Sequence, residues 1–165
     1  MKKLILLTLV VVLTGIGASA HAALRLAYVD IAKVFDKYNG TEVAKAKLKK
    51  EAETQKGKLE KDQDKLKHKL EDLQAKKKAL TDEKYKQQEE AIMGEIRTLQ
   101  GQIQVVQSGL VNQEKEMTSQ ILDEIREVVK NVADKEKWDY VFEQNALLFG
   151  GTEITATVLK QLNSK

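Results

Sequence analysis

Side chains that commonly carry out catalysis are scarce in this chain of 165 residues. It has no cysteine, and beyond the first 22 residues its only histidine is His68, which lies between two lysines. Asp62 and Asp64 have the spacing of the first ligands of a calcium loop, but no glycine or later glutamate completes that loop. We therefore interpret these residues as a solvated helix surface. We expect no catalytic residue, no metal site and no cofactor, and the chain is not predicted to be an enzyme.

Lysine is unusually frequent in one part of the chain, which indicates a role for charge. Residues 45–78 contain 13 lysines and 7 acidic residues, whereas residues 79–130 contain 6 basic and 10 acidic residues. One explanation is attraction between a basic and an acidic helix, with ion pairs worth a few tenths of a kcal/mol each. The other is that Lys76, Lys77 and Lys78 form a basic tip that steers acidic partners or lies near an anionic lipid surface. The two explanations are compatible.

The residues that carry these charges lie in about ninety residues of proline-free helical sequence. Between residues 41 and 80 the apolar residues have the heptad spacing of a narrow coiled-coil seam: Leu59, Leu66, Leu70, Leu73 and Leu80. A fuller seam follows at Ile92, Ile96, Leu99, Ile103, Val106, Leu110 and Met117. We predict a helical hairpin arm over residues 41–132, with its tip near 79–83 and Thr81 capping the return helix.

Short β-like segments flank the arm. Leu24–Asp30 and Trp138–Phe142 read as strands, and Ala146–Phe149 as a third. Asp30 is expected to cap a helix over Ile31–Tyr38, Asn39-Gly40 reads as a turn, and Ile154–Leu162 as an amphipathic closing helix. The predicted fold class is α+β: a long coiled-coil hairpin projecting from a small β body, in the order β, α-hairpin, β, β, α.

The β body is small for an independent fold. Aromatic residues are few and lie mostly near the two ends, within residues 23–40 and 133–165, and small domains bury little surface. We therefore expect the body to be completed by oligomerisation. The residues predicted to form it are Tyr28, Val29, Tyr140, Val141, Phe142, Leu147, Leu148 and Phe149.

The first 22 residues have the pattern of a cleaved signal peptide: Lys2 and Lys3, an apolar run, and small residues ending at Ala20 or Ala22. Removal of the two lysines from 28 basic residues leaves 26 against 25 acidic ones. That balance argues against a nucleic-acid partner, which favours a strongly basic domain. An exported protein without cysteine suits an oxidising compartment.

The end segments resemble the Skp (OmpH-like) family of periplasmic chaperones. The resemblance is carried by LAYVDIAKVF at residues 26–35, WDYVFEQNA at 138–146 and ITATVLKQLN at 154–163. It implies a homotrimer whose strands form a common body and whose arms surround a cavity. It also implies ATP-independent binding of unfolded outer-membrane proteins, which prevents their aggregation. Some members carry consecutive arginines for lipopolysaccharide on the returning arm. Residues 111–117 here have no such run, so that site is not carried over.

Binding of unfolded chains needs apolar groups that are exposed but dispersed. The candidates for contact with such clients are the three tip lysines together with Tyr85, Met93, Val105 and Val111. Burial inside the hairpin is the alternative for each apolar candidate. A structural coiled-coil spacer or adaptor of the cell envelope is the alternative function. A stiff spacer requires a continuous seam, whereas Lys77 occupies a seam position here and Gly57, Gly94, Gly101 and Gly109 interrupt the helices.

Overall fold

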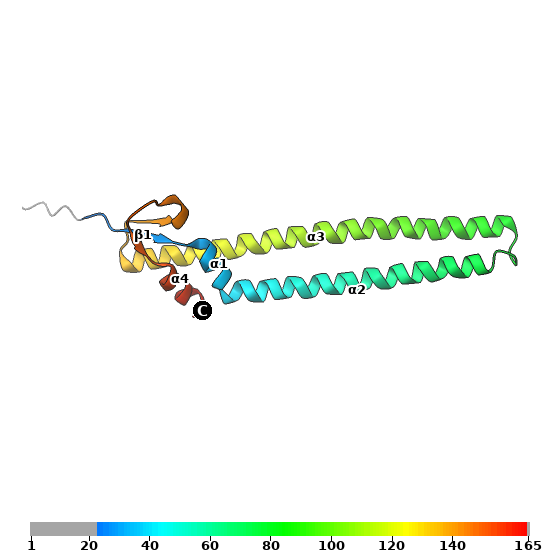
Figure 1. Cartoon of the computed structure of the whole chain (residues 1–165), viewed down its shortest axis with the longest axis horizontal. Helices are drawn as coiled ribbons and strands as arrows, with labels where there is room; N and C mark the ends of the chain where they lie inside the picture. Colours follow the sequence, from blue (N-terminus) through cyan, green and yellow to red (C-terminus); the bar gives the residue numbers. More distant parts are fainter. Residues whose placement is uncertain (1–22, 165) are drawn as a thin grey trace, which may run out of the picture.

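The computed structural model describes residues 23–164, so the predicted signal peptide lies outside the described residues. Two long antiparallel helices, α2 (Asn39–Ala75) and α3 (Asp82–Glu136), form an arm that extends from a small platform at one end (Figure 1). At about 1.5 Å per residue, the 37 residues of α2 span roughly 55 Å. Within the described residues, no helix combines the length and the apolar character needed to cross a membrane.

The platform is built on a three-stranded parallel sheet of order β2-β1-β3. Its central strand is β1 (Leu26–Val29), which pairs with β2 (Tyr140–Glu143) on one side and β3 (Thr152–Glu153) on the other. Helices α1 (Ile31–Lys37) and α4 (Thr155–Leu162) complete the platform. Both chain ends therefore meet in one sheet, as the sequence predicted, and the arm is the long excursion between them.

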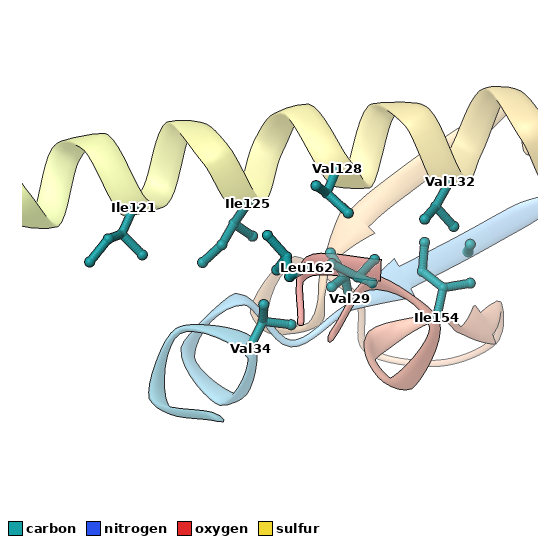
Figure 2. Packing of buried hydrophobic residues seen from close by; sticks show 10 residues of the cluster. Val29, Val34, Ile121, Ile125, Val128, Val132, Ile154 and Leu162 are labelled. Atoms are coloured by element: carbon teal, nitrogen blue, oxygen red, sulfur yellow. The ribbon is translucent and has the colours of Figure 1, made fainter. Parts of the chain in front are cut away.

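One face of β1 enters the platform core. Ala27 and Val29 are 0% and 2% exposed and alternate with the half-buried Leu26 and Tyr28. The last turns of α3 cover this face together with α1 and α4 (Figure 2). The buried residues of this cluster are Ala27, Val29, Val34, Ile121, Ile125, Val128, Val132, Ile154, Val158 and Leu162. The wider apolar pattern at the end of α3 thus marks the point where that helix enters the platform.

The prediction of a turn at Asn39-Gly40 is wrong, because both residues already belong to α2. The break between α1 and α2 is the single extended residue Tyr38, with φ −75° and ψ 125°. Its ring lies against Gly40, where an added Cβ would be 2.4 Å from Tyr38 Cε1. A larger residue here would require the Tyr38 ring to move, because the outer atoms of the ring occupy the space of a side chain.

The prediction of a strand at Ala146–Phe149 is also wrong. Gln144–Ala146 form a 3₁₀ turn, η1, and the exposed Leu148 and Phe149 follow it. Gly150 and Gly151 then have φ values of 87° and 85°, in the left-handed region that glycine enters readily. They redirect the chain so that Thr152–Glu153 pairs with β1.

Two helix caps are confirmed. Asp30 Oδ1 accepts the Lys33 amide at 2.9 Å, and the Thr81 side chain accepts the amide of Lys84 at 3.4 Å. The reversal of the arm lies between Ala75 and Asp82, so it begins before the predicted segment 79–83 and ends within it.

The C-terminus of α3 is held by Arg25. Its Nη1 donates to the carbonyls of Glu136 at 2.7 Å and Lys137 at 3.3 Å, and its guanidinium lies 4.4 Å from the centre of the Trp138 ring. The backbone amide of Arg25 donates to Asp139 Oδ2 at 2.7 Å. These contacts fix the point where the arm returns to the sheet.

Candidate functional site

The half of the arm near the tip has a core of its own. Leu66, Leu73, Ile92 and Leu99 are buried between α2 and α3, and the flanking seam residues are half-buried: Leu59, Leu70, Leu80, Ile96 and Ile103. This cluster and the platform core share no residue. Between them the facing residues Leu48, Val106 and Leu110 are only half-buried. The seam is therefore discontinuous near the root of the arm.

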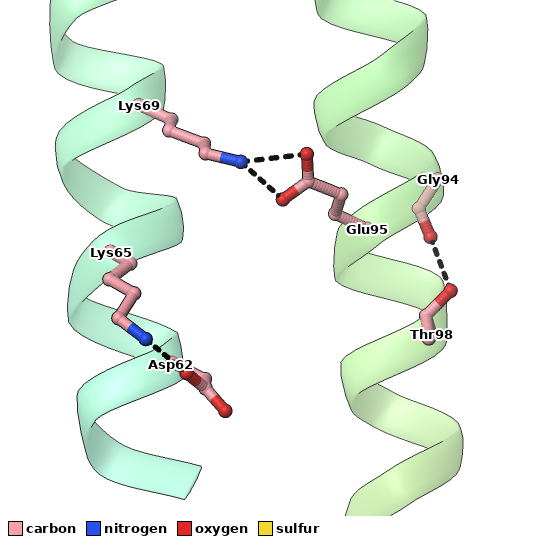
Figure 3. Close-up of polar contacts among 6 residues, drawn as sticks. All are labelled: Asp62, Lys65, Lys69, Gly94, Glu95 and Thr98. Carbon is pink, nitrogen blue, oxygen red and sulfur yellow. Dashed lines mark hydrogen bonds and ion pairs between the residues drawn. The ribbon is translucent and has the colours of Figure 1, made fainter. Parts of the chain in front are cut away.

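Few ion pairs join the basic helix α2 to the acidic helix α3. Among the described residues, Lys69–Glu95 is the one ion pair that joins α2 to α3, with Nζ 2.7 and 2.6 Å from the two carboxylate oxygens (Figure 3). Both side chains are about half exposed, so the pair contributes little to stability. Most of the α2 lysines therefore remain available to solvent and to other molecules.

The tip lysines lie in the turn after α2 and are exposed. Lys77 Nζ is 5.3 Å from the centre of the Tyr85 ring, a cation–π distance. Tyr85 itself is half-buried and packs against the tip cluster. The structure thus gathers Lys76, Lys77, Lys78 and Tyr85 at the far end of the arm.

The other three apolar candidates do not enter the hairpin core. Met93, Val105 and Val111 are 48%, 70% and 64% exposed. Six residues separate Val105 from Val111, which places them about 120° apart around α3. The exposed apolar groups are therefore dispersed over the arm, and none of these three forms a concentrated patch with another.

Two open grooves on the arm are lined in part by the exposed residues Val111 and Val105. A groove of about 580 Å³ at the arm root is lined by apolar side chains of α1, α2 and α3 and by the charged residues Lys45, Lys49 and Glu114; the apolar residues include Phe35, Leu48, Leu110, Val111 and Met117. A second groove of about 480 Å³, farther along the arm, is lined by residues that include Leu59, Gly101 and Val105. Sequence reasoning missed the first groove, because Phe35 comes from a short helix far from α3 in the sequence.

The residues predicted to form the oligomeric body separate into two groups. Val29 is buried in the platform core and Val141 packs against it. The register pairs Leu26 with Tyr140 and Tyr28 with Phe142, which puts these four side chains on the opposite face of the sheet.

That opposite face is apolar and largely uncovered. Tyr140 and Phe142 are 56% and 37% exposed, and their rings stack with centroids 6.2 Å apart. In the loop after β2, Leu147 is half-buried, whereas Leu148 and Phe149 are almost fully exposed. We call this face, formed by Leu26, Tyr28, Tyr140 and Phe142 with Leu148 and Phe149, the aromatic face.

The residues first considered for catalysis are surface residues of the arm. His68 Nδ1 lies 3.4 Å from Glu71 on the same helix, and Asp62 accepts a hydrogen bond from Lys65 at 2.8 Å. Both interactions join residues three apart on α2. His68 is exposed, whereas Asp62 is half-buried and lines a groove with Gly94, Glu95 and Thr98 of α3. Among the described residues, no three histidine or acidic side chains are placed to hold a metal ion.

The sequence model of the family described as "Outer membrane protein (OmpH-like)" matches residues 25–162. The chain belongs to the OmpH-like family. One relative of this OmpH-like chain is "Chaperone protein Skp" of Photorhabdus luminescens, 27% identical over 164 residues, covering 98% of this chain and 99% of the relative. An OmpH-like protein of Caulobacter crescentus with a known crystal structure has a TM-score of 0.79 at 17% identity, covering 87% of this chain and 86% of its own. That likeness confirms the α+β fold with its long helical arm.

Proposed function

We propose that this chain is an ATP-independent holdase chaperone of the periplasm that binds unfolded outer-membrane proteins and prevents their aggregation. The observation that carries the proposal is the arm itself, a long hairpin with exposed, dispersed apolar groups and little apolar core of its own. Family membership and the chaperone name of the Photorhabdus relative support it. The discontinuous seam argues against the alternative of a stiff spacer, because a rigid rod needs uninterrupted packing.

The proposed assembly is a homotrimer in which the aromatic face of each platform contacts the other subunits. Soluble proteins rarely leave large contiguous apolar patches uncovered, and this face contains Tyr140, Phe142, Leu148 and Phe149. Contact between platforms would leave the arms free to surround a cavity for the client. The signal-like residues 1–22 support export before assembly.

The assembly is tested by sedimentation of the protein without its first 22 residues. We expect the mass of a trimer, and we expect Tyr140→Lys combined with Phe142→Lys to give a folded monomer. Gln87→Lys combined with Gln88→Lys, which changes two exposed arm residues, serves as the matched control. A stable wild-type monomer at micromolar concentration would contradict the proposed assembly.

Holdase activity is tested by diluting a urea-denatured β-barrel outer-membrane protein into buffer without nucleotide. Light scattering should fall as the chaperone is added and reach its minimum near one oligomer per client. Unchanged scattering at an excess of the oligomer would refute the proposed function. The same assay with an unrelated folded coiled coil controls for non-specific crowding.

A further inference from the structure

The middle of α3 carries no charge over sixteen consecutive residues, Thr98–Gln113. At the chain-wide charged fraction of 32%, such a stretch would contain about five charged residues. The facing helix shows no such gap, since residues 45–65 include 13 charged side chains. We call residues 98–113 the neutral band. A solvated helix surface normally contains charged residues, so solvation does not explain their absence from the neutral band.

One exposed side of the neutral band lies next to the seam, about 100° around α3 from it. Leu99, Ile103, Val106 and Leu110 form the seam toward α2, and the positions that follow each of them by one residue are exposed: Gln100, Gln104, Gln107 and Val111. Steps of 4, 3 and 4 place these last four side chains on a single side of α3. We call them the amide stripe. It leads from the middle of the arm to the root groove, which Val111 lines.

Hydrogen bonds within the protein leave the amide stripe available. Thr98 and Ser108 donate to backbone carbonyls of their own helix at 3.0 Å. Gln113, at the end of the band, donates to Glu51 at 3.3 Å. In the described part of the chain, Gln100, Gln104 and Gln107 form no side-chain hydrogen bond with another residue. Each amide offers two donor hydrogens and an acceptor oxygen.

We propose that the amide stripe and the root groove form the contact site for an extended, uncharged segment of an unfolded membrane strand. This inference rests on the proposed holdase function and locates it on the arm. An unfolded strand presents free backbone N–H and C=O groups, which glutamine amides bind without regard to sequence. Its alternate side chains are apolar, because transmembrane strands alternate apolar and polar residues. In the root groove, Phe35, Leu48 and Met117 offer apolar contacts to such a side chain beside Val111, and Lys45, Lys49 and Glu114 also line the groove.

Two physical arguments favour this occupant. A charged side chain beneath a docked segment would lose hydration without gaining a partner, which is costly, so a neutral surface suits the contact. The band is also long enough for several alternating side chains: sixteen helical residues span about 24 Å, which corresponds to about seven extended residues, most of a transmembrane strand. Charged residues border the band at both ends, Arg97 on one side and Glu114 to Glu116 on the other.

The test uses charges of both signs in the full oligomer. Gln104→Lys with Gln107→Lys and Gln104→Glu with Gln107→Glu keep the helix, because all three residue types have similar helix propensity. A urea-denatured β-barrel outer-membrane protein labelled with a fluorophore serves as the client. We expect either pair of charges to speed client dissociation by about tenfold, since both bury an unpaired charge beneath the client. The matched control is Gln87→Lys with Gln88→Lys, outside the band, and should change dissociation by less than about twofold.

Each outcome decides the inference. Faster dissociation with both signs, and not with the control, supports it. An effect of one sign only shows that net charge matters and neutrality does not, which overturns it. Unchanged dissociation with both signs overturns it while leaving holdase activity intact, whereas failure of the wild-type protein to retain the client refutes the proposed function itself. A changed sedimentation mass of the free variants would show that the band contacts a neighbouring arm, and this too overturns the inference.

Discussion

Replacing Ile125 with alanine should destabilise the platform while leaving the arm helical. Ile125 is 0% exposed and belongs to the platform core. The change removes three carbon atoms, and the surrounding helices and strand come from distant parts of the chain, so they close the cavity only in part. Transfer and cavity terms together predict a loss of about 3 kcal/mol in the free energy of unfolding.

The chain contains its own reporter for this measurement. Trp138 is the single tryptophan and packs against the platform core, so its fluorescence reports the platform and not the arm. With an m value of about 2 kcal/mol per molar urea, a loss of 3 kcal/mol lowers the midpoint by about 1.5 M. Far-UV circular dichroism, dominated by α2 and α3, reports the arm. Variants must be compared at equal protein concentration, because the proposed assembly would stabilise the folded state.

Ile96→Ala is the matched control. Ile96 is half-buried in the tip cluster, which shares no residue with the platform core. We expect the circular dichroism transition to move to lower urea concentration and the Trp138 transition to move by less than about 0.3 M. If Ile96→Ala shifts the Trp138 transition as much as Ile125→Ala does, the two clusters unfold as one unit and the reasoning is refuted.

Three further predictions concern the arm and its root. Replacement of residues 66–100 by the turn segment 76–81 shortens the arm. The platform should stay folded, as reported by Trp138 fluorescence, and suppression of client aggregation should become weaker. Loss of the oligomer would show that the arm carries assembly. Substitution of Lys76, Lys77 and Lys78 by glutamine should slow client association, measured by stopped-flow, at about 0.05 M salt. It should have no effect at about 0.5 M salt, where the Debye length is below about 5 Å. An unchanged association rate at low salt would show that these lysines are only solvated. Gly40→Ala should displace the Tyr38 ring from the platform and lower the Trp138-monitored stability by less than about 1 kcal/mol, because the cost of moving the ring is partly offset by the better helix propensity of alanine. If Gly40→Ala has the same effect in a Tyr38→Ala background, the clash is not the cause.

The arm was predictable because its signals are local and periodic. The seam residues Leu66, Leu73, Ile92 and Leu99 are buried as the heptad spacing predicts. Thr81 caps α3 as its residue type and position indicate. A helix is decided by residues within a few turns of one another, so a single sequence contains most of the information needed.

The platform was less predictable because its strands are decided by distant partners. Ala146–Phe149 has an apolar strand pattern, but β1 already pairs on that side with Thr152–Glu153, which Gly150 and Gly151 place in register. Asn39-Gly40 reads as a turn locally, yet Asn163, the residue after α4, accepts the Asn39 amide at 3.0 Å and α2 begins there. Burial raises the pKa of the Tyr38 hydroxyl, and the hydrogen bond to Glu124 and the charge of Glu124 raise it further. This environment of Tyr38 is also set by tertiary structure.

The candidate site was predictable only in part. The exposure of Val105 and Val111 follows from their places off the seam, and both had been considered as contact residues. The amide stripe was not predicted, because its glutamines are neither apolar nor charged and the stretch is defined only by the lack of charge. A scan for uncharged runs in charged helices would have found residues 98–113 from the sequence alone.

The central position of β1 has a consequence for the order in which the molecule forms. During synthesis, Leu26–Val29 emerge early, yet their partners Tyr140–Glu143 and Thr152–Glu153 emerge more than a hundred residues later. Contacts between residues far apart in the sequence form slowly, whereas helices and hairpins form quickly from local contacts. The arm should therefore be helical while β1 still lacks both neighbours, and the aromatic face cannot exist until the last thirty residues have been released. Any association of chains through that face must therefore wait until nearly the whole chain has been released.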